Sequence, residues 1–134
     1  MAYMEHGERP LLKMPAKNAT GSTIPANRIV TKTSSDDDYG VALPSADTDP
    51  VYGVTDRAIA DLDTGNVTVQ GVVNIECASA VTAKDKVTTD TSGKAVTWTA
   101  AGGRALVGVA LTTTTTSGQL VLVALTGPGA YGIS

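Results

Sequence analysis

Apolar side chains recur at every second position between Asn66 and Cys77. Because successive side chains of a β-strand point to opposite faces, this period predicts a strand with one buried face. Gly71 falls on the same alternation without contributing a side chain, so we expect a bulge or bend in the middle of the strand. The buried face is expected to consist of Val67, Val69, Val73, Ile75 and Cys77.

Shorter segments have the same strand character, since they are rich in the threonine and valine that suit a pleated sheet. The turn residues Asp90-Thr91-Ser92-Gly93 predict a hairpin between two of them. The nearly continuous apolar run 104–111 predicts a strand covered on both faces. No segment predicts a helix longer than two turns, so the expected fold class is all-β. The expected strands are 28–33, 39–43, 51–55, 86–89, 94–99, 104–111 and 119–125.

The core of such a fold must be thin. The chain has 134 residues, no phenylalanine and only 4% aromatic residues, so valine, isoleucine, leucine and alanine must fill the interior. A chain of this length can fold as one domain without disulfides or a metal. A small β-barrel or a sandwich encloses an interior of this kind.

The first 27 residues show neither helical nor strand periodicity and contain Pro10, Pro15 and Pro25. We expect an extended N-terminal arm over 1–27, a β domain over 28–126 and a C-terminal tail over 127–134. Fully extended, the arm would reach about 90 Å, which is enough to contact a neighbouring molecule. The alternative is a tail without a role.

Charge and hydropathy exclude two classes of partner. The formal net charge is −3, and no stretch clusters lysine or arginine, so nucleic-acid binding is disfavoured. No run of eighteen apolar residues occurs, so we expect no spanning helix, and the N-terminus lacks the pattern of a secretory signal.

Few residues are suited to catalysis or metal binding. The one histidine, His6, lies in the expected arm, which removes the base from Ser-His-Asp and Cys-His schemes. One histidine and one cysteine do not make a zinc site, and Cys77 is expected to be a buried thiol. The neighbouring Asp36, Asp37 and Asp38 favour a solvated turn over a calcium site. We therefore expect no catalytic residue, no metal and no cofactor.

Two alternative functions have some support in the sequence. Leu62-Asp63-Thr64-Gly65 resembles the active-site triplet of retroviral-type aspartic proteases, in which Asp63 would be the catalytic residue, although this string is also ordinary turn chemistry. A glycan-binding β module is the other alternative, but the chain has a single tryptophan, Trp98. A lone tryptophan favours a core or subunit-interface position over a ligand platform.

Several segments in order resemble the capsid cement or decoration proteins of tailed bacteriophages. The likeness covers about residues 27–125 and depends on order and spacing more than on any single residue. It is carried by 29–43, Gly53-Val54, Gly71-Val72-Val73, Ala83-Lys84-Asp85-Lys86-Val87, Leu106-Val107-Gly108-Val109-Ala110-Leu111 and Leu120-Val121-Leu122-Val123.

The resemblance implies a structural virion protein rather than an enzyme. It implies a compact, β-tulip-like domain that assembles as homotrimers on the capsid exterior, after synthesis in the host cytoplasm. An arm reaching onto the major capsid protein is also implied, and Trp98 is the expected subunit-interface residue. The expected capsid-binding residues of the arm are Leu11, Leu12, Met14, Pro15 and Ile24.

Overall fold

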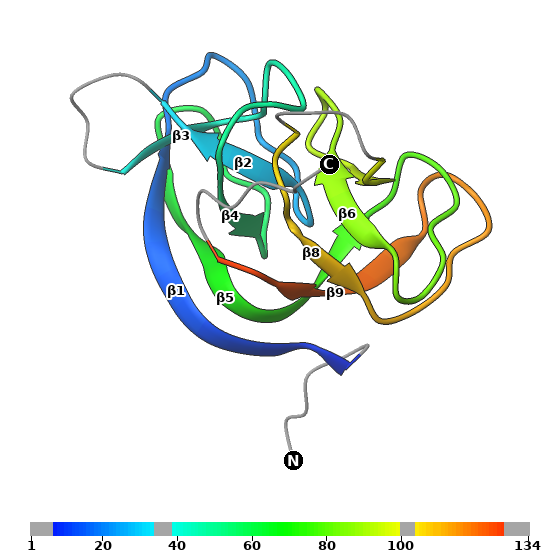
Figure 1. The fold of residues 1–134 in the computed structure, drawn as a ribbon. Helices are drawn as coiled ribbons and strands as arrows, with labels where there is room; N and C mark the ends of the chain where they lie inside the picture. The colour runs from blue at the N-terminus through cyan, green and yellow to red at the C-terminus, as the bar shows by residue number, and fades with distance from the viewer. Residues whose placement is uncertain (1–6, 34–38, 100–103, 128–134) are drawn as a thin grey trace.

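The computed structural model describes residues 7–33, 39–99 and 104–127. Within these ranges the chain forms nine strands of one sheet and no helix (Figure 1). The all-β, single-domain fold class is thus confirmed. The strands are β1 (Arg9–Asn18), β2 (Ile29–Lys32), β3 (Gly40–Ala42), β4 (Val51–Thr55), β5 (Thr64–Glu76), β6 (Lys86–Thr89), β7 (Ala95–Thr97), β8 (Gly108–Ala110) and β9 (Leu120–Leu125).

Five of the strands close into a ring. The sheet order is β1-β3-β2-β4-β5-β9-β8-β6-β7, and β1 also pairs with β5, which joins the first five strands end to end. β1 runs antiparallel to β5 from Arg9 opposite Val72 to Lys17 opposite Thr64. In Figure 1, β1 curves around the outside of the molecule next to β5. The remaining four strands continue the sheet beyond β5.

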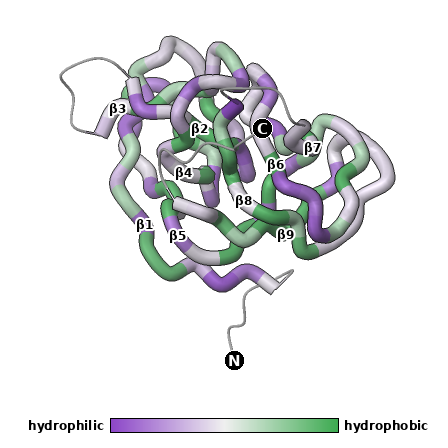
Figure 2. Tube along the Cα trace, viewed as in Figure 1, coloured by the Kyte–Doolittle hydropathy of each residue, from purple (hydrophilic) through white to green (hydrophobic). Residues whose placement is uncertain are grey.

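Two hydrophobic clusters fill the interior, and β5 contributes to both. Figure 2 shows the hydrophobic stretches of β5, β8 and β9, which are neighbours in the sheet. The cluster of the ring consists of Ala16, Ile24, Val30, Val41, Ile59, Val67 and Val69. The second cluster takes in residues of β2 and β4 as well as of the strands beyond the ring, and consists of Ile29, Val51, Val54, Val73, Ile75, Cys77, Val81, Val87, Ala95, Ala105, Val107, Ala110, Val121 and Val123.

The long strand β5 behaves as its alternation predicts. Its alternating apolar positions are buried, with Val67 and Val69 in the ring cluster and Val73 and Ile75 in the other. On the opposite face Val72 is half-buried, and Thr68 and Asn74 are buried as well. Gly71 has φ +119°, a conformation that favours glycine, and the β1–β5 register becomes irregular beside it. The bend at Gly71 therefore lets one face of one strand serve two clusters.

β1 forms where the sequence analysis expected no regular structure. The segment Arg9–Asn18 contains Pro10 and Pro15, which cannot donate hydrogen bonds, and its apolar residues do not alternate. Most of β1 pairs on one side only, with β5, and an edge position tolerates proline. The domain boundaries expected at residues 27 and 127 stay predictions.

The other expected strands form with shifts of a few residues, and β6 and β7 make the predicted hairpin. One expectation was wrong. The run 104–111 is not a strand covered on both faces, because only Gly108–Ala110 forms a strand and Val109 is exposed. Residues 104–107 instead form an irregular segment in which Ala105 and Val107 are buried. His6, Asp36–Asp38 and residues 128–134 of the expected tail lie outside the described residues.

Candidate functional site

The most exposed large apolar side chain that the structure describes is on β1. Leu11 is 80% exposed, and its neighbour Leu12 is 45% exposed. The register passes from Pro10 opposite Gly71 directly to Leu12 opposite Gln70, so Leu11 is a bulged residue without a partner in the ladder. The bulge therefore places two adjacent leucines at the surface, where they contribute nothing to the core.

The other expected arm contacts lie elsewhere. Met14 and Pro15 are half-buried, and Met14 packs against the ring cluster. Ile24 is only 1% exposed and pairs with Ile59 through two backbone hydrogen bonds of 3.0 and 2.8 Å. The structure thus brings Leu11 and Leu12 together on the surface and assigns Ile24 to the core.

Side-chain contacts hold β1 in place in addition to its pairing with β5. Lys13 Nζ lies 2.7 Å from Asp56 Oδ2 in the loop after β4. The Tyr52 hydroxyl donates to the Pro15 carbonyl at 3.3 Å. At the end of the strand the buried Asn18 amide donates to two carbonyl oxygens, at 2.7 and 2.8 Å, which anchors the chain where it leaves the sheet.

Burial raises the pKa of Tyr52 above its ordinary value near 10, and the nearby Tyr39 adds a smaller contribution in the same direction. The folded protein therefore holds the phenolic proton more tightly than the unfolded chain. The contribution of Tyr52 to the free energy of unfolding is therefore fully present below pH 10, and it is lost as the pH rises through the pKa of the folded state.

Replacing Tyr52 by phenylalanine should consequently change the response to alkaline pH. Between pH 8 and pH 11 the wild type should lose more stability than Tyr52→Phe, because only the wild type must ionise this phenol. Urea midpoints of both proteins at the two pH values measure the difference, and lysine titration cancels in the comparison. Equal losses in the two proteins would contradict the assignment.

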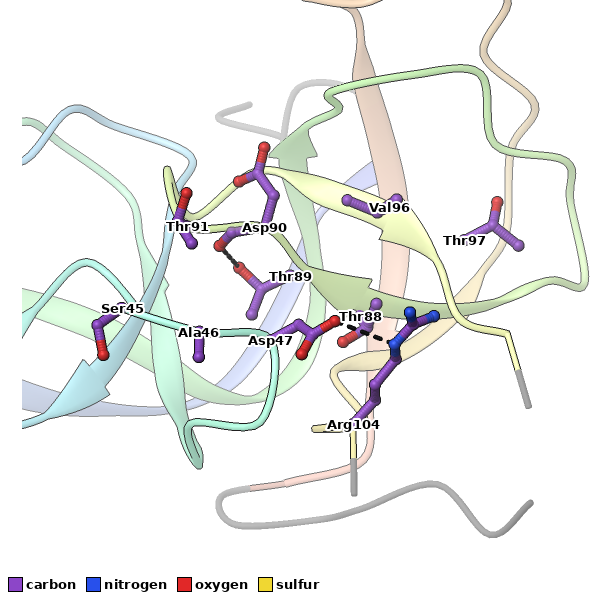
Figure 3. A pocket seen from close by; sticks show the side chains of 10 residues that line it. All are labelled: Ser45, Ala46, Asp47, Thr88, Thr89, Asp90, Thr91, Val96, Thr97 and Arg104. Carbon is purple, nitrogen blue, oxygen red and sulfur yellow. Dashed lines mark hydrogen bonds and ion pairs between the residues drawn. The ribbon is translucent and has the colours of Figure 1, made fainter. Parts of the chain in front are cut away.

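A cavity of about 520 Å³ lies between the loop after β3 and the β6–β7 hairpin (Figure 3). Arg104 Nε lies 3.0 Å from Asp47 Oδ2, and this ion pair spans one side of the cavity. Thr88 is 3% exposed, and its hydroxyl is buried without a hydrogen-bond partner among the described residues. The lining residues are Ser45, Ala46, Asp47, Thr88, Thr89, Asp90, Thr91, Val96, Thr97 and Arg104.

Both walls of this cavity are held by their own hydrogen bonds. The Asp49 carboxylate accepts from the Ser45 backbone N–H at 2.7 Å and from its hydroxyl at 2.9 Å. These bonds lower the pKa of Asp49 below its ordinary value, the backbone bond most strongly. In the hairpin, Asp90 Oδ1 accepts from the N–H groups of Ser92 and Lys94, both at 2.9 Å. The cavity is thus preformed.

The residues singled out for chemistry are not assembled into a reactive site in the described part of the chain. Asp63 is exposed at the end of a turn in which its N–H bonds the Ala60 carbonyl at 3.0 Å. Cys77 is buried and free, with Sγ 3.4 Å from Thr114 Oγ1. The described residues contain no group of three or more His, Cys, Asp or Glu side chains suited to a metal ion.

Trp98, the expected interface residue, is half-buried just after β7. Lys86 Nζ lies 5.2 Å from the centre of its ring, and the indole N–H is buried without an acceptor among the described residues. In the same ranges of the chain, no helix has the length and apolar character needed to cross a membrane.

Comparison with known proteins agrees with the sequence resemblance. The family model described as phage cement protein matches residues 12–125. The chain belongs to the phage cement protein family. As a cement protein it is a structural component of a phage head, and the family supports a structural role over the protease alternative.

A solved structure has the same fold as this cement protein. The N base of the head fiber gp8.5 in bacteriophage phi29 superimposes with a TM-score of 0.67 over 90% of this chain and 98% of that chain, at 18% sequence identity. A search of curated proteins finds no match. At so low an identity the likeness concerns the fold, which accommodates almost wholly different side chains.

Proposed function

We propose that this cement protein binds the outer surface of the major capsid protein shell through β1 and thereby stabilises the phage head. The observation that carries the proposal is the pair Leu11 and Leu12, exposed side by side on a bulged strand of a cement protein. Burial of one leucine contributes about 1.5–3 kcal/mol, so two of them supply a substantial part of a protein contact. Their exposed position outside the core favours a role in binding.

The anchoring of β1 also supports the proposal, because a force on the capsid contact at Leu11 and Leu12 would pass through β1 to the rest of the domain. β1 closes the ring and is tied to β4 and the following loop through Tyr52 and Asp56. A capsid subunit held by Leu11 and Leu12 is thus coupled to a strand fixed along most of its length. This arrangement suits a protein that resists separation of capsid subunits.

We also propose that the protein acts as a homotrimer on the capsid exterior, after synthesis in the host cytoplasm, with Trp98 at the contact between copies. Trp98 is only half-buried in one copy, so part of this side chain can still be covered by a neighbouring copy. Three copies on one assembly gain avidity that a single copy lacks. Sedimentation analysis of the free and capsid-bound protein gives the oligomeric state.

Replacing Leu11 and Leu12 together by serine should weaken binding to undecorated mature phage heads by about 10- to 100-fold, because the contact loses two buried apolar side chains. Co-sedimentation over a range of protein concentrations measures the affinity. Both side chains are exposed, so the urea midpoint of the free protein should stay nearly unchanged.

Leu62→Ser is the matched control, since Leu62 is 71% exposed and lies beside Asn18, at the other end of β1 from Leu11. It should leave head binding intact. Wild-type affinity in the double variant would overturn the proposed role of β1. Point substitutions are preferable to deletion of residues 1–27, because deletion removes β1 from the ring and Ile24 from the core.

A further inference from the structure

We propose that a groove on the outer face of β9 is the docking site for residues 1–6 of the same chain, with the side chains of Tyr3 and Met4 inside it. The groove has a volume of about 490 Å³ and is lined by Asn74, Thr112, Thr113, Gln119, Leu120 and Leu122. The inference does not depend on capsid binding, because it concerns a contact within one chain.

The first argument is the apolar surface of the groove. Val121 and Val123 of β9 are fully buried, so the alternating residues Leu120 and Leu122 point to the opposite face of the strand. Leu120 is 40% exposed. Leu111, whose N–H donates to the Leu122 carbonyl at 2.7 Å, is 48% exposed next to them. Exposed leucines that gather on one face of a sheet favour a contact with another apolar group.

The second argument is that the polar walls of the groove already have hydrogen-bond partners. The Thr112 hydroxyl accepts from the Leu122 N–H at 3.0 Å. Gln119 Oε1 accepts from the N–H groups of Thr115 and Thr116, at 2.7 and 3.2 Å. The groove is therefore preformed. An occupant gains most of its binding free energy from the leucines, which favours an apolar segment over a polar ligand.

The third argument is the place at which the described chain begins. A Cβ on Gly7 would lie 3.3 Å from Leu122 Cδ2, so the backbone of Gly7 passes beside a residue of the groove. The carboxylate of Glu8 accepts from the Asn74 N–H at 2.9 Å, and Asn74 also lines the groove. Asn74 and Leu122 are opposite each other in the β5–β9 pair. The residues that precede Gly7 therefore start at the edge of the groove.

The fourth argument is the length and composition of this segment, which reads Met-Ala-Tyr-Met-Glu-His. An extended residue spans about 3.3 Å, so Met4 and Tyr3 can reach about 10–13 Å from Gly7. Leu120 is two positions from Leu122 on β9, a distance of about 7 Å. Both side chains are thus within reach of the exposed leucine. Docking there would remove apolar surface from water and fix the N-terminal end of β1 against β9.

The test is an NMR measurement on the full-length protein with ¹³C-labelled methyl groups of methionine and leucine. Nuclear Overhauser effects should connect the Met4 methyl group to those of Leu120 or Leu122, and they should persist on dilution. Met14, which packs against the ring cluster, is the internal reference, because its contacts should be the same in every sample. Absence of any such effect from Met4 to the two leucines would overturn the proposal. Effects found only between differently labelled chains of a mixed sample would also overturn it, since the occupant would then be a second copy.

Melting temperatures test the same contact through a cycle of substitutions. Met4→Ala and Leu120→Ala should each lower the melting temperature by about 2–5 °C. The two together should lower it by less than the sum, because both remove one shared contact. Leu62→Ala is the control partner for Met4→Ala, since Leu62 lies beside the other end of β1, and this pair should be additive. Additive decreases for Met4→Ala and Leu120→Ala would overturn the proposal.

Discussion

Gly71→Ala should detach β1 from β5 and lower the free energy of unfolding by about 2–5 kcal/mol. A Cβ at this position would lie 2.5 Å from the Arg9 carbonyl oxygen, 2.7 Å from the Leu11 nitrogen and 2.9 Å from the Pro10 Cα. All three are backbone atoms of β1, so no side-chain rotation relieves the overlap. The positive φ of +119° adds strain for any residue with a Cβ. Urea unfolding and amide hydrogen exchange over Arg9–Asn18 measure the effect.

Gly118→Ala is the matched control for this substitution. Gly118 has φ +91°, but a Cβ there would meet no atom within 4 Å. Gly118→Ala should lower the free energy of unfolding only through the unfavourable backbone conformation, by about 1–2 kcal/mol. The additional loss in Gly71→Ala then measures the close approach of β1. If β1 is the capsid-binding strand, Gly71→Ala should also reduce head binding while Gly118→Ala does not. Equal losses of stability in the two variants would contradict the close approach.

Gly108→Ala should destabilise the domain by about 3 kcal/mol or more through the β8–β9 pair. A Cβ at Gly108 would overlap the Ala124 carbonyl oxygen and lie 2.8 Å from its carbon, whereas ordinary contacts begin at 3.4 Å. Gly108 also pairs with Val87 of β6, so a shift of β8 disturbs two neighbouring strands. The loss is a large fraction of the total stability expected for a small domain, about 5–15 kcal/mol.

The neighbouring residue provides the control, because Val109 is on the same strand with its side chain exposed. Val109→Ala should change the free energy of unfolding by less than about 1 kcal/mol. Thermal and urea unfolding of the two variants beside the wild type give the comparison. A Gly108→Ala protein with wild-type stability would show that β8 and β9 can separate without cost, contrary to the packing described.

The strands that could be predicted from the sequence are those in which apolar and polar residues alternate. The alternation around Val67, Val73 and Ile75 predicted both β5 and its bend at Gly71, because side-chain direction in a strand depends on position alone. β1 lacked that signal. Its prolines and two register irregularities hide the strand, and its pairing with β5 joins residues that are far apart in the sequence, from Arg9 opposite Val72 to Lys17 opposite Thr64. The partial exposure of Val109 also depends on the neighbouring strands, which the apolar run 104–111 does not reveal.

The candidate sites were predictable to a smaller degree. Leu11 and Leu12 were expected to bind because they are apolar residues of the expected arm, and the structure places both at the surface. Their role in binding stays a prediction. Ile24 has the same sequence character but lies in the core, since only the pairing with Ile59 decides its burial. The cavity had no local signal, because Asp47, Thr88 and Arg104 meet only through the order of the strands.

At the bulge on β1 the backbone and the side chain are under different evolutionary constraints. The backbone of this strand must follow β5 closely, as the narrow space beside Gly71 demonstrates, but the Leu11 side chain has no partner in the ladder. Mutations at Leu11 can therefore accumulate without loss of folding. If β1 binds the phage capsid as proposed, such proteins can adapt to a changing capsid surface by altering one or two side chains, while the strand that carries them is inherited intact.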